Sequence, residues 1–435
     1  MSIPRVTVVG AGLAGVEAAY QLALRGIPVR LYEMKKVRKS PAHKMETFAE
    51  LVCSNSLRSD SLENAAGLLK EELRRLGSLV MRVAEETKVP AGSSLAVDRT
   101  EFSQRLTNII RENPMIEIVE EEVTEIPEGP LILASGPLTS DALFDALRRK
   151  TGEDTLYFFD AAAPIIEADS IDMNIAYFKS RYDKGEATYI NCPMTKAEYD
   201  HWFEELIHAE CVIPKDFELK VFEGCMPFEE MARRGKDTLL FGPMKPVGLE
   251  KPDGTRPYAV VQLRQDNLSA SMYNLVGFQT HLTFPEQQRI LRLIPGLQNA
   301  RIMRYGVMHK NTFLNAPKIL NDVYQMKADP DVFIAGQLSG VEGYLESVAS
   351  GMIASLNMAN RVRNRPRVPF PVETAMGSQA HYLAFSNPHD FQPMNVNHGL
   401  FPPLADRHPR RSRKILLAER SLAALAAFWE AHPFD

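Results

Sequence analysis

The stretch RVTVVGAGLAGVEAAYQLALRG, residues 5–26, decides the fold. Its first five residues form a β-branched run that predicts a short strand, and the segment after the glycines is rich in helix formers. The next run, PVRLYE at 28–33, predicts a second strand that ends on the acidic Glu33. Strand, glycine turn, helix, strand and acid, in that order, are the full context of a dinucleotide-binding fingerprint.

Each glycine of this turn has a physical task. Gly10 allows the tight turn, Gly12 lets the backbone approach a pyrophosphate, and Gly15 lets the helix pack closely on the strand. Glu33, eighteen residues after Gly15, is placed to accept hydrogen bonds from a ribose diol, which favours FAD or NAD. A glycine-rich turn of an unrelated α/β fold is the alternative. At this turn the predicted cofactor site comprises Gly10, Ala11, Gly12, Leu13, Ala14 and Gly15.

A second glycine motif favours FAD over NAD. Residues 331–335 (DVFIA) predict another buried strand, followed by GQLSGVEGYLESVASG at 336–351 and an alanine-rich helical stretch. In flavoproteins with two dinucleotide-binding motifs, such a late strand returns to the first Rossmann unit and places a helix dipole near the flavin. We therefore add Gly336, Gly343 and Tyr344 to the cofactor site. An independent α/β unit is the alternative.

The middle of the chain predicts an insertion. Residues 98–112 have the apolar spacing of an amphipathic helix, and PLILASG at 130–136 predicts a further strand with a glycine turn. From about residue 186 the composition changes, and the chain consists of short segments rich in Pro, Gly and aromatic residues. We predict an α/β, Rossmann-type flavoprotein fold with an inserted smaller α+β domain. Its parts are 1–185 (FAD-binding, first part), 186–284 (insertion) and 285–435 (FAD-binding, second part with C-terminal helices).

Composition limits the partners. Of 435 residues, 45% are hydrophobic and 24% charged, and the net charge of -5 gives no global attraction for nucleic acid or acidic membranes. A polyanion partner must therefore use a local patch, such as RHPRRSRK at 407–414. No segment reaches the length of a membrane span and the N-terminus is unlike a signal peptide, so we expect a cytoplasmic protein.

The four cysteines, Cys53, Cys192, Cys211 and Cys225, form no CxxC pair. This spacing argues against a disulfide framework, a zinc site or a dithiol redox centre. Cys53 stands out because it lies in a polar run, ELVCSNSLRS at 50–59. A free cysteine is more commonly a small buried hydrophobe, so a reactive thiolate and an inert cysteine both remain open from the residues alone.

Several long blocks in order along nearly the whole chain resemble one family, the folate- and FAD-dependent tRNA (uracil-5-)-methyltransferases (TrmFO), which are related to GidA. The blocks are GAGLAGVEAAYQLA, FAELVCSNSLRSDSLENAAGLLKEELRRLGS, VPAGSSLAVDR, FEGCMPFEEMARRG, LFGPMKPVGL, RYGVMHKNTFLNAP, AGQLSGVEGYLESVASG and FQPMNVNHGLFPPL. The resemblance implies an enzyme that takes a methylene group from 5,10-methylenetetrahydrofolate and reducing equivalents from NAD(P)H. Its product would be 5-methyluridine in the T-loop of tRNA, made without S-adenosylmethionine or a metal.

This chemistry requires thiols. Uracil C5 is a weak nucleophile until a thiolate adds to C6, and a second group must then remove the C5 proton. By resemblance, Cys53 and Cys225 match the family's two functional cysteines, and we assign Cys53 as nucleophile and Cys225 as base, although the sequence does not order these roles. Arg58 is the kind of local positive charge that would lower a thiol pKa. Cys192 and Cys211 we interpret as structural.

Other functions remain open at this point. The same chemistry on a uridine of 23S ribosomal RNA is the first, because no catalytic motif identifies the RNA. A GidA-type wobble-uridine modifier is disfavoured because the chain ends at residue 435, without that family's long helical C-terminal region. A non-catalytic flavin-binding, RNA-associated protein and an S-adenosylmethionine methyltransferase complete the set. Since Cys53 and Cys225 fall in different predicted domains, one shared site must lie at the domain interface. The sequence does not predict the oligomeric state.

Overall fold

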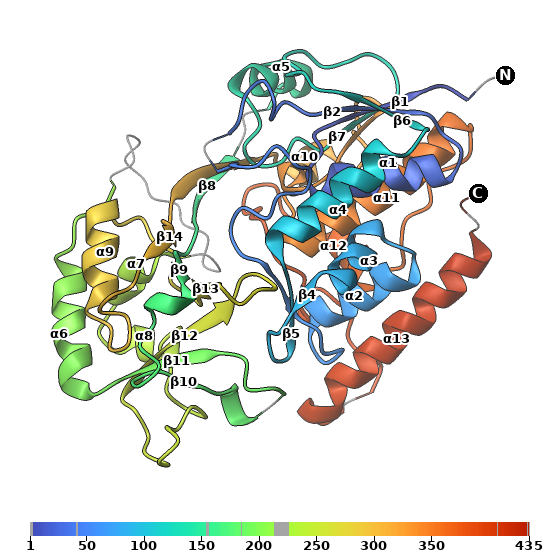
Figure 1. The fold of residues 1–435 in the computed structure, drawn as a ribbon. Helices are drawn as coiled ribbons and strands as arrows, with labels where there is room; N and C mark the ends of the chain where they lie inside the picture. The colour runs from blue at the N-terminus through green and yellow to red at the C-terminus, as the bar shows by residue number, and fades with distance from the viewer. Residues whose placement is uncertain are drawn as a thin grey trace.

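The chain folds into two lobes, each with its own sheet (Figure 1). The computed structural model describes residues 3–40, 42–153, 156–183, 185–212, 226–406, 408–432 and 434. Each lobe has a separate cluster of buried hydrophobic side chains. The N-terminal and C-terminal segments both belong to the first lobe, and the second lobe is formed by the middle of the chain.

A five-stranded parallel sheet, in the order β16-β7-β1-β2-β6, forms the first lobe. Its strands are β1 (Val6–Val9), β2 (Val29–Tyr32), β6 (Ile116–Val119), β7 (Leu131–Leu133) and β16 (Val332–Ile334). Leu131 of β7 is paired with Thr7 of β1 on one side and with Val332 of β16 on the other. The prediction that the late strand returns to the first Rossmann unit is confirmed, and the alternative of an independent unit is wrong.

Two long helices lie against each other beside this sheet, α1 (Leu13–Leu24) and α11 (Tyr344–Val362) (Figure 1). They approach closely because α11 has a glycine at the contact. A Cβ atom added to Gly351 would lie 2.3 Å from the backbone oxygen of Ala14. The N-termini of the two helices therefore start close together, both at the carboxyl ends of the parallel strands.

A helical layer covers the rest of the first lobe. The predicted helix at 98–112 is confirmed as α4 (Arg99–Arg111), whose N-terminus is capped by Asp98. One carboxylate oxygen of Asp98 accepts from the backbone N–H groups of Thr100 and Glu101, each at 3.0 Å. The remaining elements of the lobe are α2 (Ala65–Arg75), α3 (Leu79–Glu86), α5 (Asp141–Thr151), α10 (Ala316–Ile319), α12 (Ala375–Phe385), α13 (Arg410–Ala431) and the small sheet β3 (Ser56–Ser59), β5 (Ser94–Val97) and β4 (Lys88–Val89).

The second lobe contains a six-stranded antiparallel sheet in the order β10-β11-β12-β13-β9-β14. Stacked aromatic rings, including Trp202 and Phe228, pack in its core. Strands β9, β10 and β14 come from outside residues 186–284, and the predicted domain boundaries stay a prediction. The elements are β9 (Ile165–Glu167), β10 (Tyr177–Phe178), β11 (Ile190–Met194), β12 (Ala259–Gln265), β13 (Met272–Leu275), β14 (Ile302–Arg304), α6 (Lys196–Ile207), α7 (Phe228–Arg233), α8 (Thr238–Phe241) and α9 (Phe284–Arg292).

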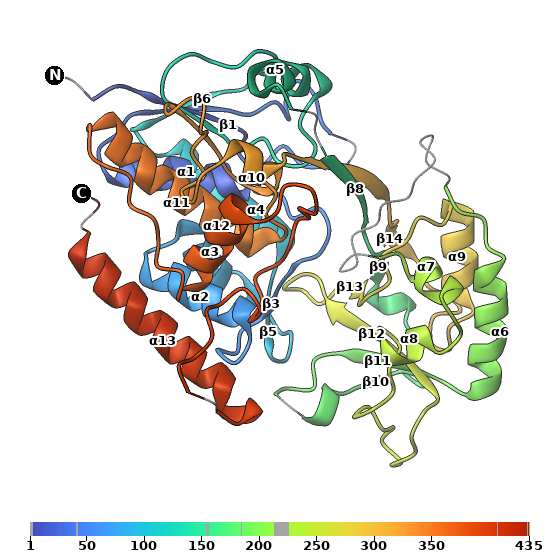
Figure 2. The same cartoon turned by 180° about the vertical axis from the view of Figure 1, so that it is seen from behind.

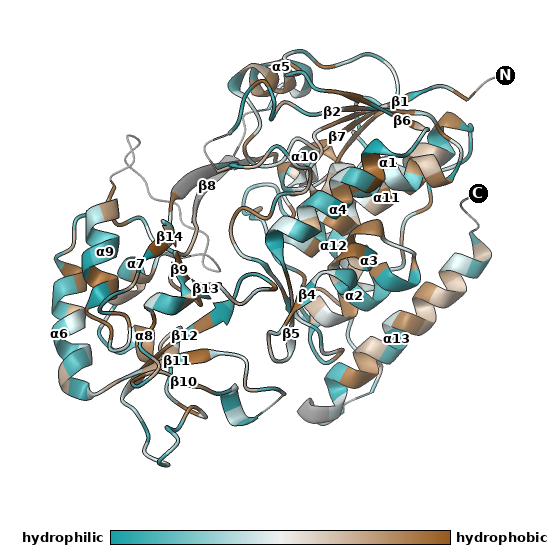
Figure 3. Ribbon diagram, viewed as in Figure 1, coloured by the Kyte–Doolittle hydropathy of each residue, from teal (hydrophilic) through white to brown (hydrophobic). Residues whose placement is uncertain are grey.

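A two-stranded antiparallel ribbon of β8 (Leu156–Ala161) and β15 (Met308–Phe313) runs between the lobes, as the rear view shows (Figure 2). Apolar residues dominate the parallel strands of the first lobe, whereas much of α6 and α9 is hydrophilic (Figure 3). Buried on both faces, such strands are expected to be continuously apolar. In the described part of the chain, no helix is both long and apolar enough to cross a membrane.

The contact between α1 and α11 predicts the effect of Gly351→Ala. The new methyl group must push the helices apart, because it meets backbone atoms of Ala14 that cannot rotate away. Overpacking of this kind costs about 1–3 kcal/mol of unfolding free energy. We expect a lower urea midpoint together with weaker flavin retention on gel filtration. Unchanged stability would show that the two helices separate without cost.

Buried Glu72 predicts a pH dependence of stability. Its carboxylate accepts from the backbone N–H groups of Ala375 and Met376, at 2.6 and 2.9 Å, and from the hydroxyl of Ser421 at 2.5 Å. Burial raises the pKa of Glu72 to about 7, from 4.5. Because the folded state holds the proton more tightly than the unfolded state, the contribution of Glu72 is full below pH 4.5 and is lost as pH rises through 7.

Glu72→Gln should therefore remove part of this dependence. Between about pH 5 and pH 8 the parent protein should lose on the order of 2–3 kcal/mol that the variant does not lose. Urea unfolding at both pH values measures the difference. Glu71→Gln, at the neighbouring position whose carboxylate pairs with Arg75, is the matched control and should follow the parent. Parallel pH curves for all three proteins would contradict the assignment.

Candidate functional site

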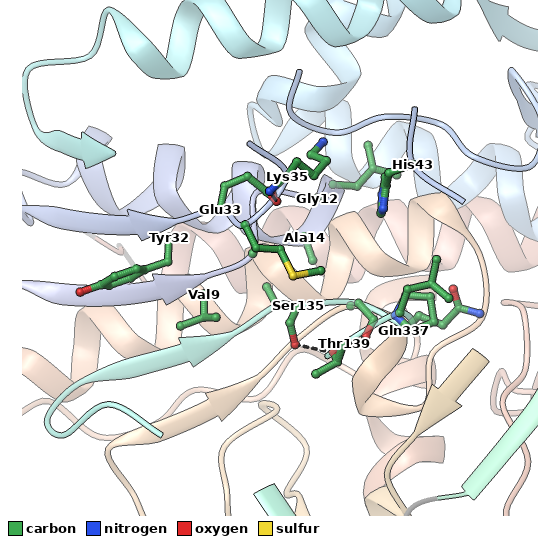
Figure 4. A pocket seen from close by; sticks show the side chains of 18 of the residues that line it. Val9, Gly12, Ala14, Tyr32, Glu33, Lys35, His43, Ser135, Thr139 and Gln337 are labelled. Carbon is green, nitrogen blue, oxygen red and sulfur yellow. Dashed lines mark hydrogen bonds between the residues drawn. The ribbon is translucent and has the colours of Figure 1, made fainter. Parts of the chain in front are cut away.

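A cavity opens where the carboxyl ends of the parallel strands meet (Figure 4). Its volume, including the part open to solvent, is about 1090 Å³. This position, at the point where strand order reverses, is where open α/β sheets bind ligands. Most of the lining comes from the ends of β1, β2, β7 and β16 and the start of α11: Val9, Gly10, Gly12, Leu13, Ala14, Tyr32, Glu33, Met34, Lys35, Ala134, Ser135, Gly136, Pro137, Leu138, Thr139, Ser140, Gly336, Gln337, Tyr344 and Ser347. The other lining residues are His43, Glu50, Val52, Glu121, Val123 and Leu143.

The glycine turn leaves room for a ligand at one position only. A Cβ atom added to Gly12 would meet no atom within 4 Å, so the backbone there faces open space. In contrast, a Cβ atom at Gly10 would lie 2.5 Å from the oxygen of Ala134, and one at Gly15 would lie 1.8 Å from the oxygen of Gly10. Gly10 and Gly15 thus allow close packing inside the protein, and Gly12 allows close approach from outside.

Two helices begin at this cavity without a side-chain cap. Gly12 precedes α1 and Gly343 precedes α11, and neither residue has a side chain that could satisfy the first N–H groups. Gly343 has φ of 108°, which favours glycine. Uncapped N–H groups and the two helix dipoles make this end of the cavity suited to phosphate groups. The residues present therefore fit a dinucleotide such as FAD.

Glu33 directly follows the last residue of β2, and its carboxylate is hydrogen-bonded to the glycine turn. One carboxylate oxygen accepts from the backbone N–H of Ala11 at 2.9 Å, and the other accepts from that of Lys35 at 3.0 Å. Each oxygen has a further lone pair for a ribose hydroxyl. Ala11, Gly15 and Gly343 do not line the cavity, whereas the other predicted cofactor residues do. The cofactor roles themselves stay a prediction.

Cys53 is tied to the cavity through Tyr344. The backbone N–H groups of Cys53 and Ser54 both donate to the Tyr344 hydroxyl, at 2.8 and 3.2 Å. Tyr344 is the first residue of α11, and both it and Val52 line the cavity. Burial raises the pKa of Tyr344, and the neighbouring thiol of Cys53 adds to this effect. The Cys53 thiol, which lies 3.8 Å from the backbone oxygen of Ala161, is partly exposed.

Two arginines, the buried Arg99 and the half-buried Arg304, hold the backbone on the N-terminal side of Cys53. Arg99 donates to the backbone oxygen of Leu51 at 2.6 Å, and Arg304 donates to that of Val52 at 2.7 Å. Arg99 comes from α4 of the first lobe, but Arg304 ends β14 of the second. Partial burial lowers the pKa of Arg304.

A third arginine, which is buried, holds the other side of the loop. Arg264, in β12 of the second lobe, donates to the hydroxyl of Ser54 at 2.6 Å and to the side-chain oxygen of Asn55 at 3.2 Å. The Asn55 amide in turn donates to the backbone oxygens of Val97 and Gln265, each at 3.0 Å. Cys53 therefore lies where the two lobes meet, and the site that it is predicted to share with Cys225 stays a prediction.

The sequence analysis missed the three arginines because they lie far apart along the chain and belong to no motif. It also did not predict the partner of Arg58. The guanidinium of Arg58 pairs with both carboxylate oxygens of the buried Glu346, at 2.5 and 2.6 Å. Glu346 therefore balances the charge of Arg58 locally, and the effect of Arg58 on the thiol of Cys53 stays a prediction. The pair fixes the start of α11 to β3.

The other cysteines differ in their surroundings. Cys225 falls in the gap at 213–225, outside the described residues. Cys192 is buried in β11, and burial raises the pKa of its thiol to about 12, so it stays protonated and unreactive at neutral pH. This agrees with its predicted structural role. Cys211 is partly exposed and lies in the second lobe.

Comparison with known proteins gives consistent relatives. Residues 5–366 match the family model described as glucose inhibited division protein A. The chain is 58% identical over 431 residues to the methylenetetrahydrofolate–tRNA-(uracil-5-)-methyltransferase TrmFO of Halalkalibacterium halodurans, covering 98% of this chain and 99% of that protein. The enzyme of the same name from Anoxybacillus flavithermus is 58% identical over 426 residues, covering 97% and 99%.

Among solved structures, a crystal form of Aquifex aeolicus GidA aligns with a TM-score of 0.71 at 16% identity. The alignment covers 98% of this chain and 73% of the GidA chain. At that identity the likeness concerns the fold alone. It agrees with the Rossmann-type architecture described above.

The arginine contacts predict the behaviour of Arg264→Met. Two hydrogen bonds from a charged, buried donor are lost, which should lower the unfolding free energy by about 2–3 kcal/mol. The loop should also become looser, so iodoacetamide should modify Cys53 several-fold faster. Mass spectrometry of the alkylated peptide and urea unfolding provide the two measurements.

Arg301→Met is the matched control. Arg301 pairs with Glu167 on the surface of the same lobe, and its side chain is 58% exposed. Loss of such an exposed pair should change stability by less than about 1 kcal/mol. An equal effect of the two substitutions on Cys53 alkylation would refute the assignment of Arg264 to the loop.

Proposed function

The chain belongs to the GidA family and, within it, to the methylenetetrahydrofolate–tRNA-(uracil-5-)-methyltransferases, and from that membership we propose its reaction. The protein methylates C5 of the T-loop uridine of tRNA and produces 5-methyluridine. The carbon comes from 5,10-methylenetetrahydrofolate, and FAD is the cofactor. One observation of the structure supports this reaction most directly: Cys53 is anchored to Tyr344 at the edge of the dinucleotide cavity.

The lining residues fit FAD, and each part of the cofactor would have its own partners. The open backbone at Gly12 and the start of α1 would hold the pyrophosphate, and Glu33 would hold the adenosine ribose. Gly336 and Tyr344, of which Tyr344 contacts the Cys53 loop, would hold the flavin. When bound and reduced by NAD(P)H, FAD supplies the hydride that completes the methyl group.

Cys53 is the nucleophile in this proposal. Its thiolate adds to C6 of the uracil, which makes C5 able to attack the activated methylene group. The arginines and Tyr344 fix the backbone on both sides of the thiol, so the sulfur meets the base with little loss of freedom on reaction. Cys225 is proposed as the base that removes the C5 proton, which breaks the bond between the methylene carbon and the nitrogen that carried it. A hydride then adds to this carbon, and the bond between Cys53 and C6 breaks.

Further parts of the proposal concern the surroundings of the reaction. The site uses both lobes, with Cys53 from the FAD-binding part and Cys225 from the insertion. The protein acts in the cytoplasm, where tRNA, folate and NAD(P)H are available. We propose the division of the chain into residues 1–185, 186–284 and 285–435 as the working description of its domains.

The proposal predicts the result of a methylation assay with Cys53→Ala. Purified flavoprotein is supplied with methylenetetrahydrofolate labelled on the methylene carbon, NADPH, and unmodified tRNA or ribosomal RNA transcripts in separate reactions. The parent should label the T-loop uridine of tRNA. Cys53→Ala should lower the rate by about 1,000-fold or more, as expected for loss of an essential nucleophile, while it retains FAD.

Cys192→Ala is the matched control, since it removes a buried thiol that the reaction does not use. It should keep activity close to that of the parent. Label found only in ribosomal RNA would replace the proposed substrate with a ribosomal uridine. Full activity of Cys53→Ala would remove Cys53 from the reaction.

A further inference from the structure

A second group of reactive side chains lies in the second lobe, outside the dinucleotide cavity. Cys211, Glu229 and His281 each direct one donor atom to a common point, and these atoms lie within 4.8 Å of one another. The donors are a thiol sulfur, a carboxylate oxygen and an imidazole nitrogen. Such a mixture suits a borderline metal ion better than any organic ligand.

Three separate parts of the lobe bring these residues together. Cys211 follows α6, Glu229 belongs to α7, and His281 follows β13. Backbone pairing holds two of them in register, because Cys211 forms an antiparallel bridge with Leu282, and the N–H of Val212 donates to the backbone oxygen of His281 at 2.7 Å. The cluster is therefore fixed by the fold and not by exposed, flexible side chains.

Two members of the cluster are almost completely removed from water. The exposed fraction is 1% for Glu229 and 3% for His281. The Nε2 atom of His281 lies 3.5 Å from a carboxylate oxygen of Glu229 and 3.2 Å from one of Glu230. Within the described residues, its Nδ1 atom has no hydrogen-bond partner. The buried imidazole thus lies beside two carboxylates and a thiol through Nε2, and this combination of donors is the one that binds a cation in a metal site.

The surroundings orient the donors as outer contacts do in metal sites. The Glu229 carboxylate accepts from the hydroxyl of Thr280, at 3.0 and 3.1 Å, and from the backbone N–H of His281 at 2.6 Å. Arg233 donates to the sulfur of Cys211 at 3.5 Å. Hydrogen bonds of this kind fix the direction of a ligating carboxylate and leave other lone pairs for the metal.

We propose that Cys211, Glu229 and His281 bind one zinc ion. Thiolate, imidazole and carboxylate supply three ligands, and a water molecule or Glu230 supplies the fourth to complete a tetrahedron. With bonds of about 2.0–2.3 Å in a tetrahedron, the donor atoms would stand about 3.3–3.8 Å apart. Metal binding therefore requires the cluster, whose donor atoms lie within 4.8 Å of one another, to contract by up to about 1 Å. Two negative ligands balance the charge of the ion in this buried place.

The alternative to a bound metal is a protonated His281. Burial alone would lower the pKa of His281, but contacts with Cys211 and Glu230 and the charge of Glu229 raise it to about 9. A protonated His281 would then satisfy the carboxylates without a metal. The two arrangements differ in metal content and in whether sulfur is bonded to a metal, so they can be separated directly.

The site has a structural consequence for the lobe. Cys211 lies just before residues 213–225 and Glu229 lies just after them. A shared ion would join the two chain ends that border this segment, and His281 would attach both to the sheet. This inference does not rest on the proposed function, because its readout is metal bound to the protein.

The first experiment measures metal in the untagged holoprotein, expressed in zinc-supplemented medium and dialysed against metal-free buffer. Elemental analysis should find about one zinc per chain, and zinc X-ray absorption should show one sulfur among the ligands. Cys211→Ser and His281→Gln should each lose most of the zinc. Cys192→Ser and His208→Gln, which change a cysteine and a histidine outside the cluster, should keep it.

A second variant guards against simple misfolding. Thr280→Val removes the hydroxyl that orients Glu229 and that also accepts from the backbone N–H of Leu282 at 3.0 Å. It should weaken zinc binding about 10- to 100-fold in competition with a chromophoric chelator while bound FAD is unchanged. Zinc well below one per chain in the parent, or an absorption spectrum without a sulfur ligand, would overturn the proposal in favour of the protonated His281. Equal zinc in the parent and in Cys211→Ser would also overturn it.

Discussion

The pairing of β7 with strands from both ends of the chain is the constraint on which the rest of the structure depends. Leu131 is paired in register with Thr7 of β1 on one side and with Val332 of β16 on the other, although β16 follows β1 by most of the length of the chain. This pairing places the start of α11 beside the glycine turn of α1, and the cavity forms between them. Tyr344 is carried to the Cys53 loop by the same helix.

Much of this could be predicted from the sequence, because the signals were local. Gly10, Gly12, Gly15 and Glu33 stand at the spacing that a strand-turn-helix unit imposes, and DVFIA before a glycine run marks a second unit. Asp98 before an amphipathic stretch marked the start of α4. The confirmed return of β16 to the first sheet followed from combining two such local patterns with the known handedness and order of Rossmann units.

What could not be predicted depends on contacts between distant residues. Nothing in the sequence around Arg99, Arg264 or Arg304 distinguishes them from surface arginines, yet all three reach the Cys53 loop. The carboxylate that neutralises Arg58 comes from α11, 288 positions away. In the same way, cysteine spacing argued against zinc bound by paired cysteines, but it could not reveal a mixed group of Cys211, Glu229 and His281, which only the folded second lobe assembles.

The arginine contacts have a mechanical consequence, since Arg264 and Arg304 belong to one lobe and the loop they bind belongs to the other. If the lobes moved apart, these guanidinium groups would lose their hydrogen bonds to the loop. Each lost hydrogen bond to a charged group costs about 1.5–3 kcal/mol. The loop that carries the thiol therefore connects the two lobes and opposes their separation. An RNA base must then reach Cys53 through an existing opening, with the protein moving little and the nucleotide turning out of its own stack to enter.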